Sequence, residues 1–195
     1  MVWVPYDEED SARYLAELAR DTGGAATGAF LMIVSALLLV PVALALGTVV
    51  GERMPRLGRI AGGMAVAGTI GMASLSAVAL VACSMADAAD RTAMVGAWDS
   101  FFNGAASETI FLFILVGAIG FVALGVGLFR SGVVARPAAV LAAVGGAATL
   151  FTTGGPARGL LVVAAALALV GFAWVAAGTR TQGGTETRRH GIIRA

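Results

Sequence analysis

The stretch Ala138–Gly178 decides the fold, because it is apolar at both ends and is broken once, by Thr152-Thr153-Gly154-Gly155-Pro156-Ala157-Arg158. One continuous helix over this range would be roughly 60 Å long at about 1.5 Å per residue, twice the hydrocarbon thickness of a bilayer. The interruption combines glycine, proline and arginine, which favour a turn in contact with water. The sequence therefore predicts two antiparallel membrane spans, 137–153 and 159–178, joined by a tight hairpin.

The composition is typical of a membrane protein. The chain has 195 residues, of which 58% are hydrophobic and 13% charged, and its mean hydropathy is +0.89. Soluble domains carry about a quarter charged residues. The net charge of +1 argues against a nucleic-acid-binding protein. All 13 basic residues are arginine, which indicates a GC-rich bacterial genome.

The sequence predicts no catalytic, cofactor-binding or metal site. A single cysteine, Cys83, excludes an intrachain disulfide and a thiolate metal cage, and a single histidine, His190, excludes a bis-histidine haem site. No charged residue lies in the middle of a predicted span, where proton relays and ion pathways place them. No serine has a histidine base. We expect the hydroxyls within the spans to bond their own or a neighbouring helix backbone; they are Ser35, Thr48, Thr69, Ser74, Ser76 and Thr149.

Three further spans are expected before the hairpin, at 25–50, 60–84 and 109–129. Pro41 lies near the middle of the first span and predicts a helix kink. Ser107 is expected to cap the third span, and Glu108 adds a favourable charge to its first turn. The segment 52–59 is interpreted as a short basic loop.

The second and third spans have faces made of small side chains. In the second span these residues recur at every fourth position, and in the third span glycines flatten the surface. Such faces let a neighbouring helix approach closely, whether it belongs to the same chain or to another. The predicted helix-packing residues are Ala61, Ala65, Thr69, Ala73, Ala77, Gly117 and Gly120.

A short amphipathic helix is expected before the first span, over residues 7–21. Asp7 is its expected cap, Tyr14 and Leu15 lie on its apolar face, and Gly23-Gly24 is expected to end it. We interpret this helix as a leader packed on the bundle; the alternative is a lid that gates a ligand.

The connection 85–107 is expected to lie partly along the membrane interface as a short helix, because it is rich in aromatic residues. Its carboxylates, with one from the third span, are candidates for an outer vestibule that takes a cation or a cationic ligand. The alternative is that they are ordinary solvated acids of an outer loop. The candidate vestibule residues are Asp87, Asp90, Asp99, Glu108 and Trp98.

The arginine distribution predicts the orientation. With five spans, nine arginines fall on one side and four on the other, and the arginine-rich side is cytoplasmic. The expected organisation is an external amphipathic segment (1–24), a five-helix transmembrane domain (25–178) and a cytoplasmic arginine-rich tail (179–195). The chain is therefore expected in the bacterial cytoplasmic membrane with its amino terminus outside. The nine arginines are Arg53, Arg56, Arg59, Arg130, Arg136, Arg180, Arg188, Arg189 and Arg194.

Four stretches resemble a family of uncharacterised multi-pass membrane proteins from GC-rich bacteria, a domain of unknown function. They are Tyr14-Leu15-Ala16-Glu17-Leu18-Ala19, Leu37-Leu38-Leu39-Val40-Pro41, Met54-Pro55-Arg56-Leu57 and Gly125-Val126-Gly127-Leu128-Phe129-Arg130-Ser131. The resemblance covers most of the chain and implies an architecture but no activity. Its members look like six-span proteins with a helix ahead of the Tyr-Leu-Ala segment. The absence of that helix here would account for an external amino terminus.

The sequence thus predicts an all-α integral membrane bundle of five transmembrane helices plus a short amino-terminal amphipathic helix. The favoured function is that of a structural or accessory subunit that acts through helix packing, as a homo-oligomer or with another membrane protein. The alternative is a carrier or binder of a lipid or a small hydrophobic or cationic molecule, with a pocket beneath the acidic loop and beside Pro41. A membrane-embedded enzyme is a third class, and no cofactor is expected for it.

Overall fold

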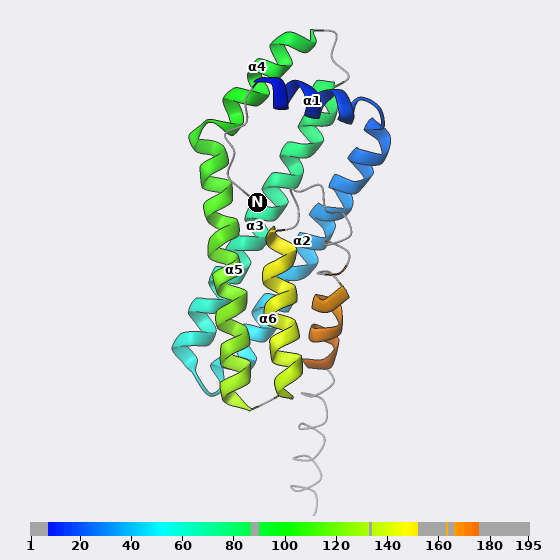
Figure 1. Ribbon diagram of the computed structural model, residues 1–195. Helices are drawn as coiled ribbons and strands as arrows, with labels where there is room; N and C mark the ends of the chain where they lie inside the picture. Colours follow the sequence, from blue (N-terminus) through cyan, green and yellow to red (C-terminus); the bar gives the residue numbers. More distant parts are fainter. Residues whose placement is uncertain (1–7, 87–89, 133, 152–162, 164–165, 176–195) are drawn as a thin grey trace, which may run out of the picture.

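The computed structural model describes residues 8–86, 90–132, 134–151, 163 and 166–175, and its regular elements within these ranges are all α-helices (Figure 1). The all-α prediction is therefore confirmed. The predicted hairpin 152–158 and the predicted tail 179–195 lie outside the described residues. The helices are α1 (Glu8–Leu18), α2 (Thr22–Gly51), α3 (Pro55–Ala86), α4 (Arg91–Phe102), α5 (Ala105–Ser131) and α6 (Arg136–Phe151), followed by the helix Ala166–Val175.

Three of these helices are long and apolar enough to cross a membrane. They are α2, α3 and α5, with 30, 32 and 27 residues. Helix α6 and the helix Ala166–Val175 are apolar but shorter within the described ranges. They correspond to the predicted fourth and fifth spans. The two short helices expected outside the spans are present as α1 and α4.

The predicted loop 52–59 is wrong in its second half, because α3 already begins at Pro55. Proline is favourable at the first position of a helix, where its missing N–H would have no partner. Arg56 and Arg59 therefore stand on the first turns of α3, and the Arg59 Nε donates to the Pro55 carbonyl at 3.4 Å. A turn of three residues, Glu52, Arg53 and Met54, joins α2 to α3.

Two helix starts also differ from prediction. Gly23-Gly24 does not end the first helix but lies in the first turn of α2, where the Asp21 carboxylate caps the helix by accepting from the Gly24 N–H at 3.0 Å. Ser107 is not the cap of α5, because that place is taken by Gly104. The Ser107 hydroxyl instead donates back to the Phe102 carbonyl at 2.7 Å and ties α5 to the end of α4.

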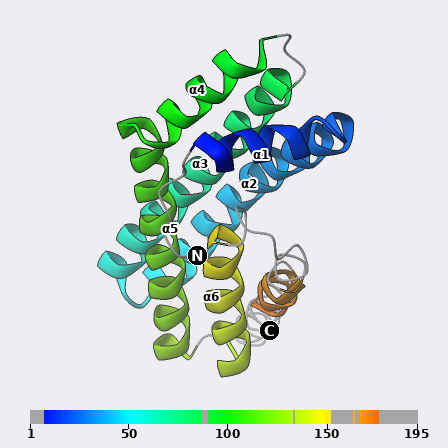
Figure 2. The same cartoon turned by 45° about the horizontal axis from the view of Figure 1, so that its top comes forward.

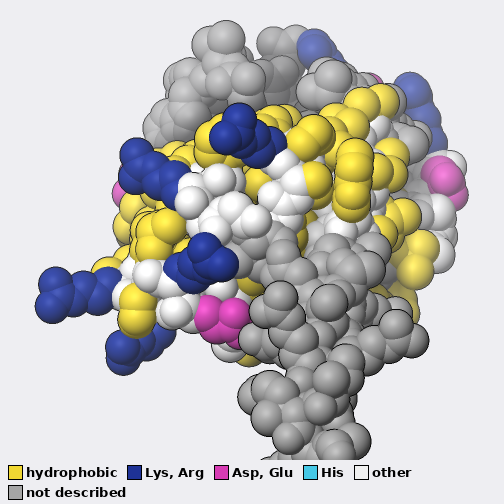
Figure 3. Space-filling view, turned by 90° about the horizontal axis from the view of Figure 1, so that it is seen from below, with side chains coloured by type: hydrophobic (Ala, Val, Ile, Leu, Met, Phe, Trp, Pro, Cys, Tyr) yellow, Lys and Arg dark blue, Asp and Glu magenta, His cyan; other side chains and the backbone are white. Residues whose placement is uncertain are grey.

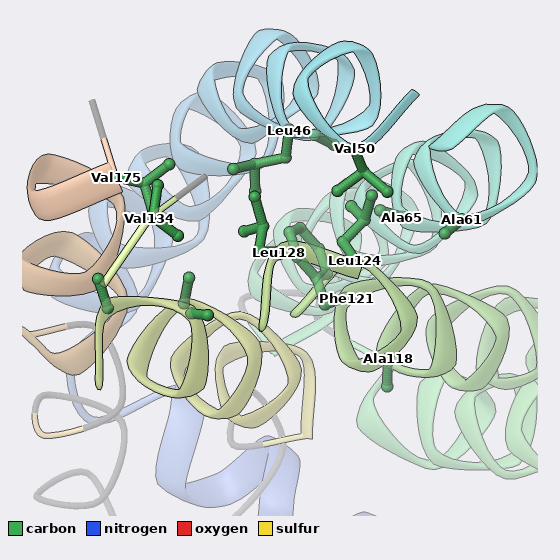
Figure 4. Packing of buried hydrophobic residues seen from close by; sticks show 14 of the residues in the cluster. Leu46, Val50, Ala61, Ala65, Ala118, Phe121, Leu124, Leu128, Val134 and Val175 are labelled. Atoms are coloured by element: carbon green, nitrogen blue, oxygen red, sulfur yellow. The ribbon is translucent and has the colours of Figure 1, made fainter. Parts of the chain in front are cut away.

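Helix α3 is the centre of the bundle, with α2 on one side and α5 on the other. A Cβ on Gly47 of α2 would lie 3.3 Å from the Cα of Gly62, and one on Gly120 of α5 would lie 2.5 Å from the backbone nitrogen of Ala65. Glycines thus let the helix backbones touch on both sides of α3. Figure 4 shows the larger side chains Phe121 and Leu124 filling the space beside these crossings.

The outer surface of the bundle is strongly apolar. Helix α2 buries only a narrow seam, with Ala29, Ala36 and Ala43 at heptad spacing. On its other faces Leu31 is 57% exposed and Leu38 65% exposed. Soluble monomers rarely leave such a continuous apolar surface in water, so this exposure agrees with a membrane environment.

Helix α5 ends at Ser131, and the residue that follows it, Gly132, has a φ of 65°. Only glycine adopts this left-handed conformation without a steric penalty. We expect Gly132→Ala to lower the free energy of unfolding by about 1 kcal/mol, with a smaller loss for Gly132→Asn. Titration with SDS in mixed micelles would measure it, and an alanine variant as stable as the wild type would contradict this assignment.

Candidate functional site

Helices α1 and α4 together cover one end of the bundle (Figures 1 and 2). Leu15 of α1 is fully buried and packs with Ala82 and Ala86 at the end of α3 and with Trp98 of α4. The Ser11 hydroxyl, also fully buried, donates to the Asp99 carboxylate at 3.4 Å. The apolar face predicted for the first helix is therefore the face by which it docks.

Aromatic rings hold this end together. Tyr14 stacks on Trp98 with ring centroids 5.3 Å apart and planes 10° apart. Phe102 lies on the same indole at 4.8 Å with tilted planes. Trp98 is only 4% exposed, and its indole N–H has no hydrogen-bond partner within the described part of the chain. The stack therefore holds α1 onto α4 by ring packing.

The described carboxylates of the predicted vestibule serve local structure. Asp90 caps α4 by accepting from the Ala93 N–H at 3.1 Å, and Asp99 accepts from Ser11. Glu108 is exposed on the first turn of α5, as predicted, and Asp87 lies outside the described residues. Among the described side chains, no three of His, Cys, Asp or Glu come close enough to hold a metal ion. Because Asp87 lies outside the described residues, the vestibule stays a prediction.

Pro41 stands on the exposed side of α2, which continues through it from Thr22 to Gly51.

The predicted packing residues divide between inner and outer positions. Ala61, Ala65 and Thr69 are buried against the neighbouring helices, whereas Ala77 is exposed. Ala73 is half-buried at the edge of the core, and Gly117 and Gly120 are buried on α5. Much of the small-residue surface is thus used inside this chain.

Four of the six hydroxyls predicted within the spans bond the backbone of their own helix, as expected, and the side chain of Thr149 lies outside the described residues. Thr69 donates to the Val66 carbonyl at 2.7 Å, and Ser76 donates to that of Met72 at 2.9 Å. Thr48 and Ser74 do the same. Each donor is thereby satisfied without a partner on another helix.

The opposite end of the bundle is basic. A Cβ on Gly127 of α5 would meet Val50 and Leu57, so the end of α5 lies beside the α2–α3 turn. Figure 3 views this end and shows arginine side chains distributed over it, with an acidic side chain among them. The exposed arginines here are Arg53, Arg56, Arg59, Arg130 and Arg136.

The comparisons with known proteins agree with the fold and add no activity. No curated protein and no solved structure gives a significant match to the chain. A family model described as a domain of unknown function, DUF4386, matches residues 3–180. This match spans the described helices and most of the sequence, and the chain therefore belongs to the DUF4386 family of unknown function.

Proposed function

We propose that this chain is a structural or accessory subunit of the bacterial cytoplasmic membrane that acts by packing against a second copy or another membrane protein. One observation carries the proposal: along its outer side α3, the central helix, has a stripe of residues that are exposed or only half-buried. The stripe alternates steps of three and four residues, which is the spacing of a helix-packing seam. We define this outer face of α3 as Ile60, Gly63, Ala67, Ile70, Ser74, Ala77 and Val81.

The shape of the outer face of α3 favours another helix as its neighbour. A Cβ on Gly63 would meet no atom within 4 Å, so the backbone is open there. Gly63 and Ala67 form a small-xxx-small pair, which allows two helices to approach closely in lipid. The exposed face of α2 carries Leu31, Leu38 and other large side chains, which keep a neighbouring backbone further away.

The proposed architecture includes five spans. The helix Ala166–Val175 packs antiparallel on α6, since Gly145 meets Ala168 and Gly171 meets Ala142. This pairing supports two further membrane segments after α5. The arginines gathered at one end support that end as cytoplasmic, with the amino terminus outside.

The alternative function, binding of a small molecule beside Pro41 and the acidic loop, has less support. Pro41 is on the exposed side of α2, and Asp90 and Asp99 already accept hydrogen bonds from the chain. A ligand that bound these two carboxylates would therefore compete with the hydrogen bonds that they accept from Ser11 of α1 and from the first turn of α4.

We expect the full chain, extracted into nanodiscs, to have the mass of a complex rather than a monomer. Gly63→Leu should shift it to the monomer, because a leucine there separates the two backbones at the seam. Gly28→Leu is the matched control: its Cβ also meets no atom within 4 Å, but it lies on α2. It should leave the complex intact. Native mass spectrometry would measure both, and a monomeric wild type with no co-purifying protein would contradict the proposal.

A further inference from the structure

A shallow apolar groove runs between α5 and α6 and ends at two arginines. Its volume is about 190 Å³, and it is open on the outer side of the bundle. Compact small molecules usually occupy pockets of about 300–1,000 Å³. This groove is smaller than those, and it suits one linear apolar chain laid along it. It is lined by Val122, Gly125, Val126, Phe129, Arg130, Ala139, Val140, Ala143 and Val144.

The sequence builds the groove by alternating small and branched residues. Gly125 sits directly against α6, where its Cβ would lie 3.2 Å from the Ala139 carbonyl oxygen, so the floor is close to backbone. Val122 and Val126 form one wall and Val140 the other, each of them about half exposed. From Val122 to Phe129 the wall extends about 10 Å along α5.

The end of the groove is positively charged. Arg130 lies in the last turn of α5 and lines the groove itself. Arg136, the first residue of α6, places its guanidinium 5.4 Å from the centroid of the Phe129 ring, which is part of the wall. Within the described residues neither guanidinium has a carboxylate partner, so both remain open to an anion.

We propose that this groove binds an anionic phospholipid, with an acyl chain along the valine walls and the phosphate on Arg130 and Arg136. Guanidinium groups bind phosphate oxygens through paired, charge-assisted hydrogen bonds. The two arginines lie at one end of the apolar groove. A phospholipid has the same arrangement, with its anionic phosphate at one end of its apolar acyl chains. The site requires residence in a bilayer but is independent of any partner on the outer face of α3.

The test compares retained lipid in full-length protein purified from nanodiscs of phosphatidylglycerol or phosphatidylcholine. Native mass spectrometry should detect one phosphatidylglycerol bound per chain and little phosphatidylcholine. The double variant Arg130→Gln/Arg136→Gln should lower phosphatidylglycerol binding on the order of a hundred-fold, since each hydrogen bond to a charged group contributes roughly tenfold. Arg53→Gln/Arg56→Gln is the matched control at the same end of the bundle, and it should change binding little.

A second variant tests the acyl path. Val140→Trp fills the groove from an outward-facing position, so the fold should tolerate it, and it should abolish lipid retention. Val170→Trp, on the exposed side of the helix Ala166–Val175, should not. Equal loss in the Arg53/Arg56 variant, equal retention of phosphatidylcholine, or unchanged retention in Val140→Trp would each overturn the proposal. So would a dimer that Val140→Trp dissociates, because a second copy would then occupy the groove.

Discussion

Replacing Gly120 by alanine is expected to destabilise the bundle more than any other exchange of a glycine for alanine discussed above. The added Cβ would lie 2.5 Å from the backbone nitrogen of Ala65 and 2.8 Å from the carbonyl carbon of Met64. Backbone atoms of a central helix cannot rotate away, so α5 must shift as a whole. Overpacking of this kind costs about 1–3 kcal/mol, and Gly120→Leu should cost more. The free energy of unfolding, from SDS titration in mixed micelles, would measure the loss.

Gly28→Ala is the matched control for this experiment. Gly28 also lies within a long apolar helix, but a Cβ there meets no atom within 4 Å. Alanine is the better helix former by roughly 0.5–1 kcal/mol, so this variant should be as stable as the wild type or slightly more stable. If Gly120→Ala were equally harmless, α3 and α5 would not cross where the structure has them.

Replacing Trp98 by alanine is expected to detach α1 and α4 from the end of the bundle. The change removes the ring on which Tyr14 and Phe102 pack, together with the contacts to Leu15. Removing a buried tryptophan costs about 3–5 kcal/mol, which exceeds what a short helix such as α1 gains from its own backbone. Limited proteolysis should then cut within α1 and α4 while the long helices stay protected.

Two control variants test whether the expected effect comes from the loss of the buried Trp98 ring. Trp174→Ala removes an indole that is 47% exposed and should change stability by less than about 0.5 kcal/mol. Trp98→Phe should retain most of the stability, because the indole N–H that it removes has no hydrogen-bond partner among the described residues. Protection of α1 in Trp98→Ala equal to that in Trp174→Ala would show that the aromatic stack does not hold α1 and α4 on the end of the bundle.

Composition and periodicity were sufficient to predict the helices. Long apolar runs predicted α2, α3 and α5, and the amphipathic pattern at Tyr14 and Leu15 predicted α1. These predictions succeeded because the length and hydropathy of a membrane helix are properties of the local sequence. The starts of helices were less predictable. Ser107 has a side chain that often caps helices, but the N-cap of α5 is Gly104. The turn after α4 determines which residue starts the helix, and the local sequence does not show that turn.

The candidate sites depended on tertiary structure. The small-residue stripe predicted close packing, but only the arrangement of α2 and α5 around α3 separates Ala65, which is used inside the chain, from Gly63, which remains open. The groove between α5 and α6 could not be predicted from the sequence, because its walls come from two helices. Its one signal in the sequence is the spacing of Val122, Val126 and Phe129 ahead of Arg130. Hydropathy is a property of each segment alone, and it therefore determined the helices and their membrane character. Which faces touch depends on the backbones of several helices at once, and only the folded bundle decided that.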